Sequence, residues 1–275
     1  MIINDKHRFV FVHIPKCAGT TVRGPLTRFN GWQLAGPPWL KTHSELGRLD
    51  YTHIPLFVLR EHFTIEFEAI QDYQSFAVVR DPFTRFASSV SQRLKMYSDT
   101  PIQKRSQYEI RSVIDECIDY LSHQPRDLHL LPPEYIHFQK QVDYIELDGT
   151  RTLKKLYTMN DIRELLTDVG RLVGQNLVKP SPEKGGETSM NRSVVFRNDF
   201  LRRVIETIRP TTKNLVNMLP ESSKKRIRDR VYVARDQRMK DTFAANHVRT
   251  FVSEYYADDI AIYLEASAPN KSQTQ

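Results

Sequence analysis

The sequence opens with a short, strongly apolar segment that runs directly into a turn of small residues. Residues 8–14, RFVFVHI, combine β-branched and aromatic side chains, which favours a buried central strand. The turn PKCAGTT (15–21) follows, and the helical pattern after it ends or bends near Gly24–Pro25. A strand that leads through a small-residue turn into a helix points backbone N–H groups at one place, where the helix dipole adds positive potential. The segment therefore predicts a turn that binds an anion such as phosphate.

The side chains of this turn suit a phosphate. Gly19 permits close approach of the backbone, Thr20 and Thr21 offer hydroxyl donors, and Lys16 supplies a full positive charge. Cys17 has a small, weakly polar side chain that fits such a turn, and a nucleophilic role for it is the alternative. For the segment as a whole, the alternative is an ordinary strand–helix turn with an exposed lysine.

The turn differs from the nucleotide-binding pattern GxxxxGK[ST]. Its lysine precedes the glycine instead of following it, and no strand ending in an acidic residue accompanies it as in magnesium-dependent ATPases. These differences argue against an ATPase that needs magnesium.

A second strand followed by a helix lies about 60 residues later. SFAVVR (75–80) predicts a buried strand, and Asp81-Pro82 is a strong helix start because Asp caps and Pro fits the first helical position. Arg80 lies at the end of the strand, where open α/β sheets bind ligands, and Ser88 follows in the second helical turn. We expect Arg80 and Ser88 to share one phosphate, with Asp81 as the helix cap and Arg85 as a salt-bridge partner. The apolar stripe of this helix consists of Phe83, Phe86, Val90, Leu94 and Tyr97.

The remaining segments predict the rest of an α/β architecture. Residues 30–50 read as a long surface loop, PLFVL within 51–63 as a strand, and 106–122 as an amphipathic helix. Further elements are strands at 142–147 and 152–158 joined by Asp148-Gly149, a helix capped at Asn160-Asp161 and running to Gly170, a polar Gly-rich loop at 181–193, and helices in the remainder. We expect three layers around a mainly parallel sheet, in a single domain over residues 1–265 with a disordered tail at 266–275.

Composition narrows the class of protein. Of the 275 residues, 40% are hydrophobic and 27% charged, which is typical of a globular domain. Charged residues interrupt the early apolar stretch, and no apolar run is long enough to span a membrane, so we expect a soluble, cytoplasmic protein with neither signal peptide nor membrane span. The two cysteines, Cys17 and Cys117, cannot form a disulfide framework and show no metal-ligand spacing, so no metal is expected.

The net charge of +7 is concentrated late in the chain. Residues 201–250 contain 13 Lys or Arg against 5 Asp or Glu. This excess is explained either by a solvated helix face or by a surface that attracts an anionic substrate or polymer.

The pairing of HIPKCAGTT with VRDPFTRFASS resembles carbohydrate sulfotransferases of the heparan sulfate 2-O-sulfotransferase type. The likeness extends to LPPEYIHFQKQVDYIEL (131–147) and EYYADDIAIY (254–263), so it covers most of the chain. It implies a P-loop-NTPase-like fold and 3′-phosphoadenosine 5′-phosphosulfate (PAPS) as sulfuryl donor. The membrane-anchored Golgi members differ from this chain, which begins almost at its first strand, so we expect a soluble, bacterial member.

The resemblance assigns roles to residues. It implies that the first motif grips the 5′-phosphosulfate, through Lys16, Cys17, Ala18, Gly19, Thr20 and Thr21. It implies that Arg80 and Ser88 hold the 3′-phosphate. His53 resembles the position of the family's catalytic histidine, and an unperturbed histidine pKa of about 6.5 suits proton abstraction near neutrality. His43 and His62 are nearby alternatives, and His13 is expected to be structural.

Several assignments stay open at this point. Lys16 is expected to stabilise the leaving group, while Arg60 and Glu61 either orient the acceptor or form a surface ion pair. Gln141 and Tyr144 are candidates for the lining of the site, and Lys184, Gly185 and Gly186 for a lid. The expected partner is a hydroxyl-bearing acceptor, which by resemblance is a saccharide or polysaccharide. Neither nucleic acid nor a metal is expected as a partner. A nucleotide-dependent kinase and a non-catalytic polyanion-binding module are the alternative functions, and the oligomeric state is open.

Overall fold

A computed structural model describes two compact units of the chain. One unit comprises Met1–Ser181 and Ala245–Gln275, and the other comprises Pro182–Ala244. The described residues are 1–32, 34, 38–97, 105–125, 128–178 and 242–268, together with the backbone of 194–196 and 232–234. The lid predicted at 181–193 lies outside the described residues, as does most of the basic region at 201–250. The single domain over 1–265 stays a prediction.

Strands and helices alternate along the first unit. Its strands are β1 (Ile2–Asn4), β2 (Phe9–Val12), β3 (Leu40–His43), β4 (Gly47–Asp50), β5 (Gln74–Val79), β6 (Glu146–Leu147), β7 (Thr150–Arg151) and β8 (Lys155–Thr158). Its helices are α1 (Gly19–Leu26), α2 (Leu56–His62), α3 (Thr64–Asp72), α4 (Pro82–Met96), α5 (Gln107–Ser122), α6 (Ile162–Val173), α10 (Asn246–Tyr255) and α11 (Ala257–Ser267), and 3-10 turns lie at Thr27–Phe29, Ile136–Phe138, Val142–Tyr144 and Met159–Asp161.

A four-stranded sheet in the order β1-β2-β5-β8 forms the centre of this unit. β1 pairs antiparallel with β2, whereas β2 with β5 and β5 with β8 pair in parallel. All four residues of β2 are buried, and so are the last five of β5, as expected for strands covered on both faces. Parallel neighbours end at the same edge of a sheet, so the segments that follow β2 and β5 begin side by side.

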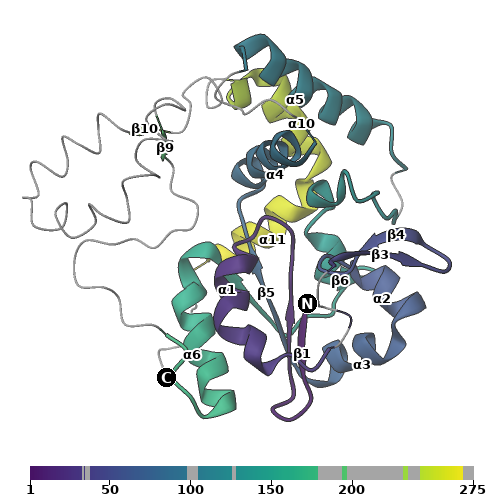
Figure 1. Ribbon diagram of the computed structural model, residues 1–275, viewed down its shortest axis with the longest axis vertical. Coiled ribbons are helices and arrows are strands. Elements are labelled where there is room, and N and C mark those ends of the chain that lie inside the picture. The colour runs from purple at the N-terminus through teal and green to yellow at the C-terminus, as the bar shows by residue number, and fades with distance from the viewer. Residues whose placement is uncertain are drawn as a thin grey trace, which may run out of the picture. The chain divides into compact units, whose positions relative to one another are not determined.

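Helices cover both faces of the sheet and gather beyond one of its ends. Figure 1 shows α1 and α6 to one side of the strands and α2 and α3 to the other. α4 packs against α5, α10 and α11, beyond the carboxyl ends of β2 and β5. The expected α/β class with a mostly parallel central sheet flanked by helices is therefore confirmed, while its P-loop-like character stays a prediction.

Local signals placed several elements correctly. Asp81 accepts a hydrogen bond from the Thr84 N–H at 2.9 Å, and Pro82 is the first residue of α4, as predicted. α5 matches the helix predicted at 106–122, and its start is a capping box between Ser106 and Glu109. Asp148 and Gly149 both have positive φ, at 52° and 72°, which makes the predicted tight turn between β6 and β7.

Three predictions were wrong. PLFVL forms the helix α2 instead of a strand, because four consecutive buried residues, Leu56 to Leu59, carry no period that separates strand from helix. Residues 30–50 contain the β3–β4 hairpin as well as loop. Only residues 155–158 of the strand predicted at 152–158 form β8, which pairs with β5 and not with 142–147. At 142–147 a 3-10 turn replaces most of the predicted strand.

The described part of the second unit is a pair of short strands. β9 (Val194–Phe196) pairs antiparallel with β10 (Tyr232–Ala234), with Tyr232 opposite Phe196. These strands correct the expectation that the chain after residue 193 is helical throughout.

Candidate active site

The turn after β2 has the geometry of an anion site. Lys16 and Ala18 adopt left-handed backbone conformations, with φ of 65° and 55°, although neither is glycine. Such conformations cost free energy and concentrate at functional sites. Ala18 precedes α1, and no described side chain caps the start of that helix. The partial positive charge at the first turn therefore faces the loop, as anion binding requires.

Gly19 is required by a neighbouring side chain. A Cβ atom at this position would lie 1.6 Å from Nε2 of His13, deep inside the imidazole ring. The sequence suggested that Gly19 lets a ligand approach the backbone, and the structure gives a second reason, namely the packing of His13 against the start of α1. His13 is buried, which agrees with its expected structural role.

Lys16 reaches from the turn to α4. Its Nζ donates to Oε1 of Gln92 at 3.1 Å. The contact holds the ammonium group between the start of α1 and the middle of α4. Gln92 had no predicted role, although it lies one helical turn beyond Ser88.

Arg80 joins the two predicted motifs. Its Nη1 donates to the main-chain oxygen of Lys16 at 3.1 Å, and its Nε donates to Oγ1 of Thr84 at 3.2 Å. Thr84, Ser88 and Gln92 follow at intervals of four residues, so they lie in one row along α4. Because the row contacts Arg80 at one end and Lys16 at the other, helix geometry places the half-buried Ser88 between the two cations.

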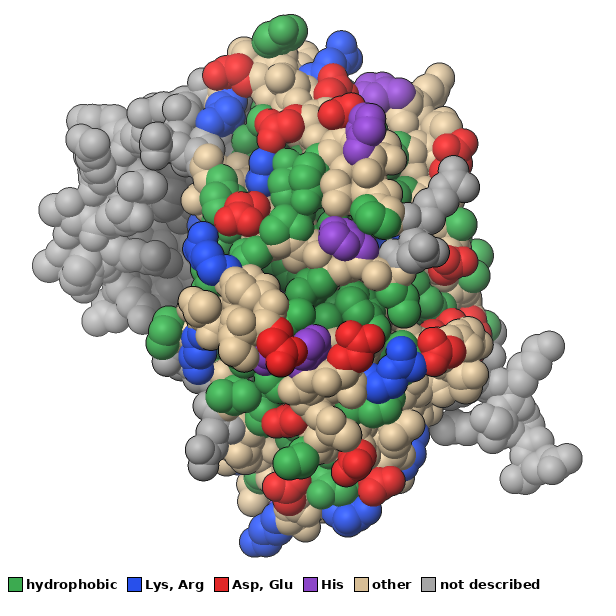
Figure 2. Space-filling model, turned by 90° about the vertical axis from the view of Figure 1, so that its right-hand side faces the viewer, with side chains coloured by type: hydrophobic (Ala, Val, Ile, Leu, Met, Phe, Trp, Pro, Cys, Tyr) green, Lys and Arg blue, Asp and Glu red, His purple; other side chains and the backbone are tan. Residues whose placement is uncertain are grey.

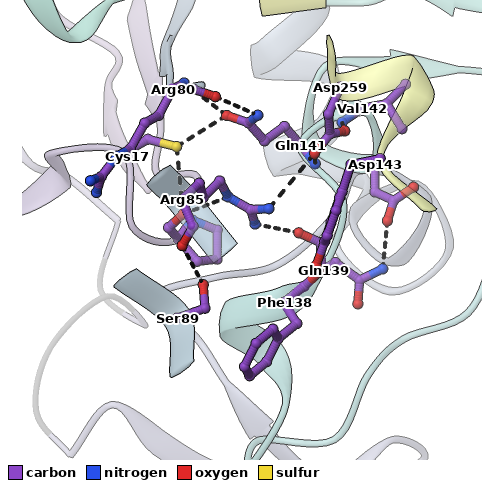
Figure 3. A network of polar contacts seen from close by, with 12 residues as sticks. Cys17, Arg80, Arg85, Ser89, Phe138, Gln139, Gln141, Val142, Asp143 and Asp259 are labelled. Atoms are coloured by element: carbon purple, nitrogen blue, oxygen red, sulfur yellow. Dashed lines mark hydrogen bonds and ion pairs between the residues drawn. The ribbon is translucent and has the colours of Figure 1, made fainter. Parts of the chain in front are cut away.

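Gln141 connects the phosphate turn after β2 with the segment after β5. Its Oε1 accepts from the Arg80 N–H at 2.9 Å and from the Cys17 thiol at 3.2 Å, and its Nε2 donates to the Arg80 carbonyl at 2.9 Å. Figure 3 shows Gln141 lying between Arg80 and Cys17 on one side and Asp259 on the other. The side chain is fully buried, so the three contacts fix the relative position of the two motifs.

Cys17 is a packing residue in this geometry. The side chain is buried, and burial raises the pKa of its thiol to about 11. A thiol with such a pKa is protonated near neutrality and is a weak nucleophile. The small-filler interpretation is thus favoured over nucleophilic catalysis.

A buried ion pair supports the turn. Arg85 and Asp259 are almost fully buried, with Nη1 and Oδ2 3.7 Å apart. Arg85 also donates from Nε to the Pro15 carbonyl at 3.1 Å and from Nη2 to the Gln139 carbonyl, while Asp259 accepts from the Gln141 N–H at 2.8 Å. Buried charges persist when they are paired and hydrogen-bonded in this way. Arg85 is therefore the salt-bridge partner that the sequence suggested, and Asp259 is a residue that no local pattern identified.

Three histidines cluster beside the turn. The His53 and His13 rings lie 4.5 Å apart, and those of His53 and His137 lie 5.7 Å apart, measured between centroids. Nδ1 of His53 is 3.0 Å from the main-chain oxygen of His13. A carbonyl only accepts, so Nδ1 carries the proton and Nε2 holds the lone pair. The phenol of Tyr144 donates to the His53 carbonyl at 3.3 Å, which further fixes this residue.

The cluster is neutral near pH 7. Burial, followed by smaller effects that include the charges of Arg23 and Lys16, lowers the pKa of His53 to about 3. Burial, then His53 and Lys16, lowers the pKa of His137 to about 3 as well. His53 is therefore unprotonated near pH 7, but it is a weaker base than the histidine with a pKa near 6.5 that the sequence suggested. Lys16 is close enough for its charge to act on both rings.

The alternative histidines lie in another cluster. His43 and His62 pack edge to face with centroids 5.4 Å apart. Nδ1 of His43 accepts from the Glu45 and Leu46 N–H groups, and Nδ1 of His62 is 3.1 Å from a Glu45 carboxylate oxygen. These hydrogen bonds are with the β3–β4 turn, whereas His53 contacts His13, which lies directly before the phosphate turn.

Arg60 and Glu61 have surface positions. Arg60 pairs with Asp148 at 2.5 Å, with 38% and 68% of their side chains exposed. Glu61 is 61% exposed and lies 3.9 Å from Nε2 of His62. These contacts match the surface ion-pair interpretation.

The profile of the family described as "Sulfotransferase family" matches residues 1–264. The chain belongs to the sulfotransferase family. No curated protein and no solved structure matches it significantly. As a sulfotransferase it is a transferase enzyme that moves a sulfuryl group, and it takes a hydroxyl-bearing acceptor.

Within the described ranges of this sulfotransferase, no helix is both long and apolar enough to cross a membrane. In the same part of the chain, no three His, Cys, Asp or Glu side chains are grouped so that they could hold a metal ion.

Proposed function

We propose that this sulfotransferase takes its sulfuryl group from PAPS and transfers it to a hydroxyl of a saccharide. The observation that carries the proposal is the contact of the Arg80 guanidinium with the backbone of Lys16, which unites two cationic segments at one sheet edge. A donor with two separate phosphate positions needs two such segments, whereas a single anion needs one.

The phosphate turn and the start of α4 would bind different phosphate groups of the donor. The start of α1, with Lys16, Cys17, Ala18, Gly19, Thr20 and Thr21, would bind the 5′-phosphosulfate through backbone N–H groups and the ammonium. Arg80 and Ser88 would bind the 3′-phosphate, because Arg80 contacts Thr84, the first residue of the α4 row that continues through Ser88 to Gln92. The donor supplies an activated sulfur whose leaving group is a phosphate.

In the proposed reaction His53 accepts a proton and Lys16 stabilises the negative charge of the leaving group. The unprotonated Nε2 of His53 accepts the proton of the acceptor hydroxyl as its oxygen bonds to sulfur. The bond from sulfur to the 5′-phosphate oxygen breaks, and Lys16 neutralises the charge that develops there. The products are a sulfate ester and adenosine 3′,5′-bisphosphate, and the proton remains on His53.

Donor turnover by single variants tests these roles. We expect His53→Ala and Lys16→Ala each to lower sulfuryl transfer by about 100-fold or more while the chain stays folded. His123→Ala and Lys95→Ala, at exposed positions, are the matched controls and should leave the rate unchanged. Full activity of both site variants would contradict the assigned roles.

The cytoplasmic location stays a prediction of the sequence.

A further inference from the structure

A cavity of about 500 Å³ lies between the β3–β4 hairpin and residues 129–136. Most of the side chains that line it are Leu, Pro or Ile, and three of them, Leu49, Leu131 and Ile136, are almost completely buried. Figure 2 shows the side of the molecule on which the hairpin lies, where hydrophobic side chains gather in a hollow. The cavity is large enough for part of a small molecule and has the apolar lining usual for binding pockets.

Both walls of the cavity adjoin the histidine cluster. Asp50 lines the cavity, and its main-chain oxygen accepts from the His53 N–H at 3.0 Å. Ile136 lines the opposite wall and directly precedes His137, whose ring lies 5.7 Å from that of His53. Neither ring lines the cavity, but the chain segments beside both histidines do, so a molecule held in the cavity lies next to the histidine cluster.

The charges around the cavity do not favour an anion. The lining contains one cation, Arg48, and two carboxylates, Asp50 and Glu134. Arg48 lies 3.8 Å from a Glu134 oxygen, so its charge is already partly compensated. An acidic polysaccharide would meet an excess of negative charge here, which is unfavourable at such short range.

We propose that this cavity binds an apolar group of the acceptor, so that the substrate is an uncharged saccharide with an aliphatic aglycone. The inference rests on the proposed sulfuryl transfer and adds the substrate class. The sugar hydroxyl lies toward His53 and the aliphatic chain lies against the half-buried Leu46, Leu130 and Pro132 of the lining. An acidic polysaccharide of the heparan type is then expected to be a poorer acceptor than the neutral glycoside.

Acceptor series that differ only in the apolar group test this proposal. With PAPS saturating, kcat/KM is measured for methyl and octyl glucosides and galactosides below the micelle concentration, and for the matching octyl glucuronide. We expect the octyl glycosides to exceed the methyl ones by at least about 50-fold, since each buried methylene adds up to about fourfold. The glucuronide should be at least about tenfold poorer than the neutral octyl glycoside. Equal kcat/KM for methyl and octyl acceptors, or a preference for the glucuronide or for heparan oligosaccharides, would overturn the proposal.

Binding measurements separate this inference from the proposed function. Adenosine 3′,5′-bisphosphate is titrated first, and octyl and methyl glycosides are then titrated into its complex with the full chain. Failure of the nucleotide to bind would refute the proposed donor site, whereas nucleotide binding with no preference for the octyl chain would refute the cavity assignment alone.

A leucine variant locates the binding site. Leu46→Ala, at the half-buried position of the hairpin turn, should reduce the octyl preference about tenfold or more and leave the affinity for adenosine 3′,5′-bisphosphate unchanged. Leu166→Ala, at a buried position of α6 outside the cavity lining, is the control that should leave both unchanged. If Leu46→Ala does not fold, Leu130→Ser, at another half-buried position of the lining, replaces it with the same expected direction. An unaltered octyl preference in the folded cavity variant would place the aliphatic chain elsewhere and contradict the proposal.

Discussion

The guanidinium of Arg80 donates a hydrogen bond to the main-chain oxygen of Lys16 across 3.1 Å. The two residues are 64 positions apart in the sequence, but each follows one of two adjacent parallel strands, β2 and β5. Their proximity is therefore a consequence of sheet topology, because parallel strands end at a common edge where α/β folds bind ligands. The same edge holds the start of α1, which no described side chain caps, and Thr84 at the first end of the row on α4.

Replacing Arg80 should weaken nucleotide binding. Arg80→Ala removes the planar cation that we assign to the 3′-phosphate, and a charged hydrogen bond of this kind contributes about 1.5–3 kcal/mol. We expect the Kd of adenosine 3′,5′-bisphosphate, measured by calorimetry, to rise about 10- to 100-fold. Arg163→Ala, at an exposed position of α6, controls for the loss of a positive charge. An unchanged Kd in Arg80→Ala would refute the clamp.

Gln141 should act as a positioning residue. Gln141→Ala leaves the part-buried N–H and carbonyl of Arg80 without their Gln141 partner, so we expect a loss of about 1–3 kcal/mol in stability and an increase in nucleotide Kd. Gln141→Glu keeps an acceptor for the Arg80 N–H and should recover part of the nucleotide affinity. A purely structural role would instead lower the free energy of unfolding in both variants with no change in Kd of the folded protein.

Cys17 should be replaceable. Burial raises its pKa to about 11, so the thiol is protonated at the working pH and donates to Gln141, a role that a serine hydroxyl also fills. We expect Cys17→Ser to keep kcat within about threefold of the unsubstituted enzyme, and the native chain to resist alkylation by iodoacetamide at pH 8. A drop in kcat of more than 100-fold at unchanged nucleotide affinity would instead identify Cys17 as a nucleophile.

The histidine cluster should make stability fall in mild acid. The folded-state pKa of His137 is about 3, below the unfolded value of about 6.5, so the unfolded chain binds more protons between these limits. Each such histidine then lowers the free energy of unfolding by up to about 1.4 kcal/mol per pH unit as pH falls from about 6.5 toward 3.

Urea unfolding of a histidine variant measures this effect. We expect His137→Gln to lose less stability than the unsubstituted chain between pH 7 and 5. Asp143, with a pKa raised by burial to about 6, acts in the opposite direction but is present in both proteins. Parallel curves of unfolding free energy against pH would contradict the assigned shift.

Local signals predicted the elements that carry the two motifs. The apolar strands predicted within 8–14 and 75–80 depend on a few neighbouring residues, and so do the Asp81-Pro82 cap and the Asp148-Gly149 turn. The structure contains all four features. PLFVL was misassigned because a fully buried segment lacks the alternation that distinguishes strand from helix. The β3–β4 hairpin was missed for a related reason, since its partly exposed strands show no clear apolar alternation.

The supporting contacts of the site could not be read from the sequence. Gln141 contacts Arg80 across 61 positions and Asp259 across 118. No local pattern distinguishes such glutamine and aspartate residues from surface ones. Their contacts form only when α11 and the 3-10 turns pack against the rest of the fold. Gln92 is the exception, since it continues the four-residue spacing from Thr84 and Ser88.

Calorimetric titration with adenosine 3′,5′-bisphosphate and with ATP tests the central claim, a clamp for two separate phosphates, most directly. We predict at least about 100-fold tighter binding of the bisphosphate, without any requirement for magnesium, because Arg80 and Lys16 serve separate phosphate positions. Equal affinities, or tighter magnesium-dependent binding of ATP, would contradict the clamp.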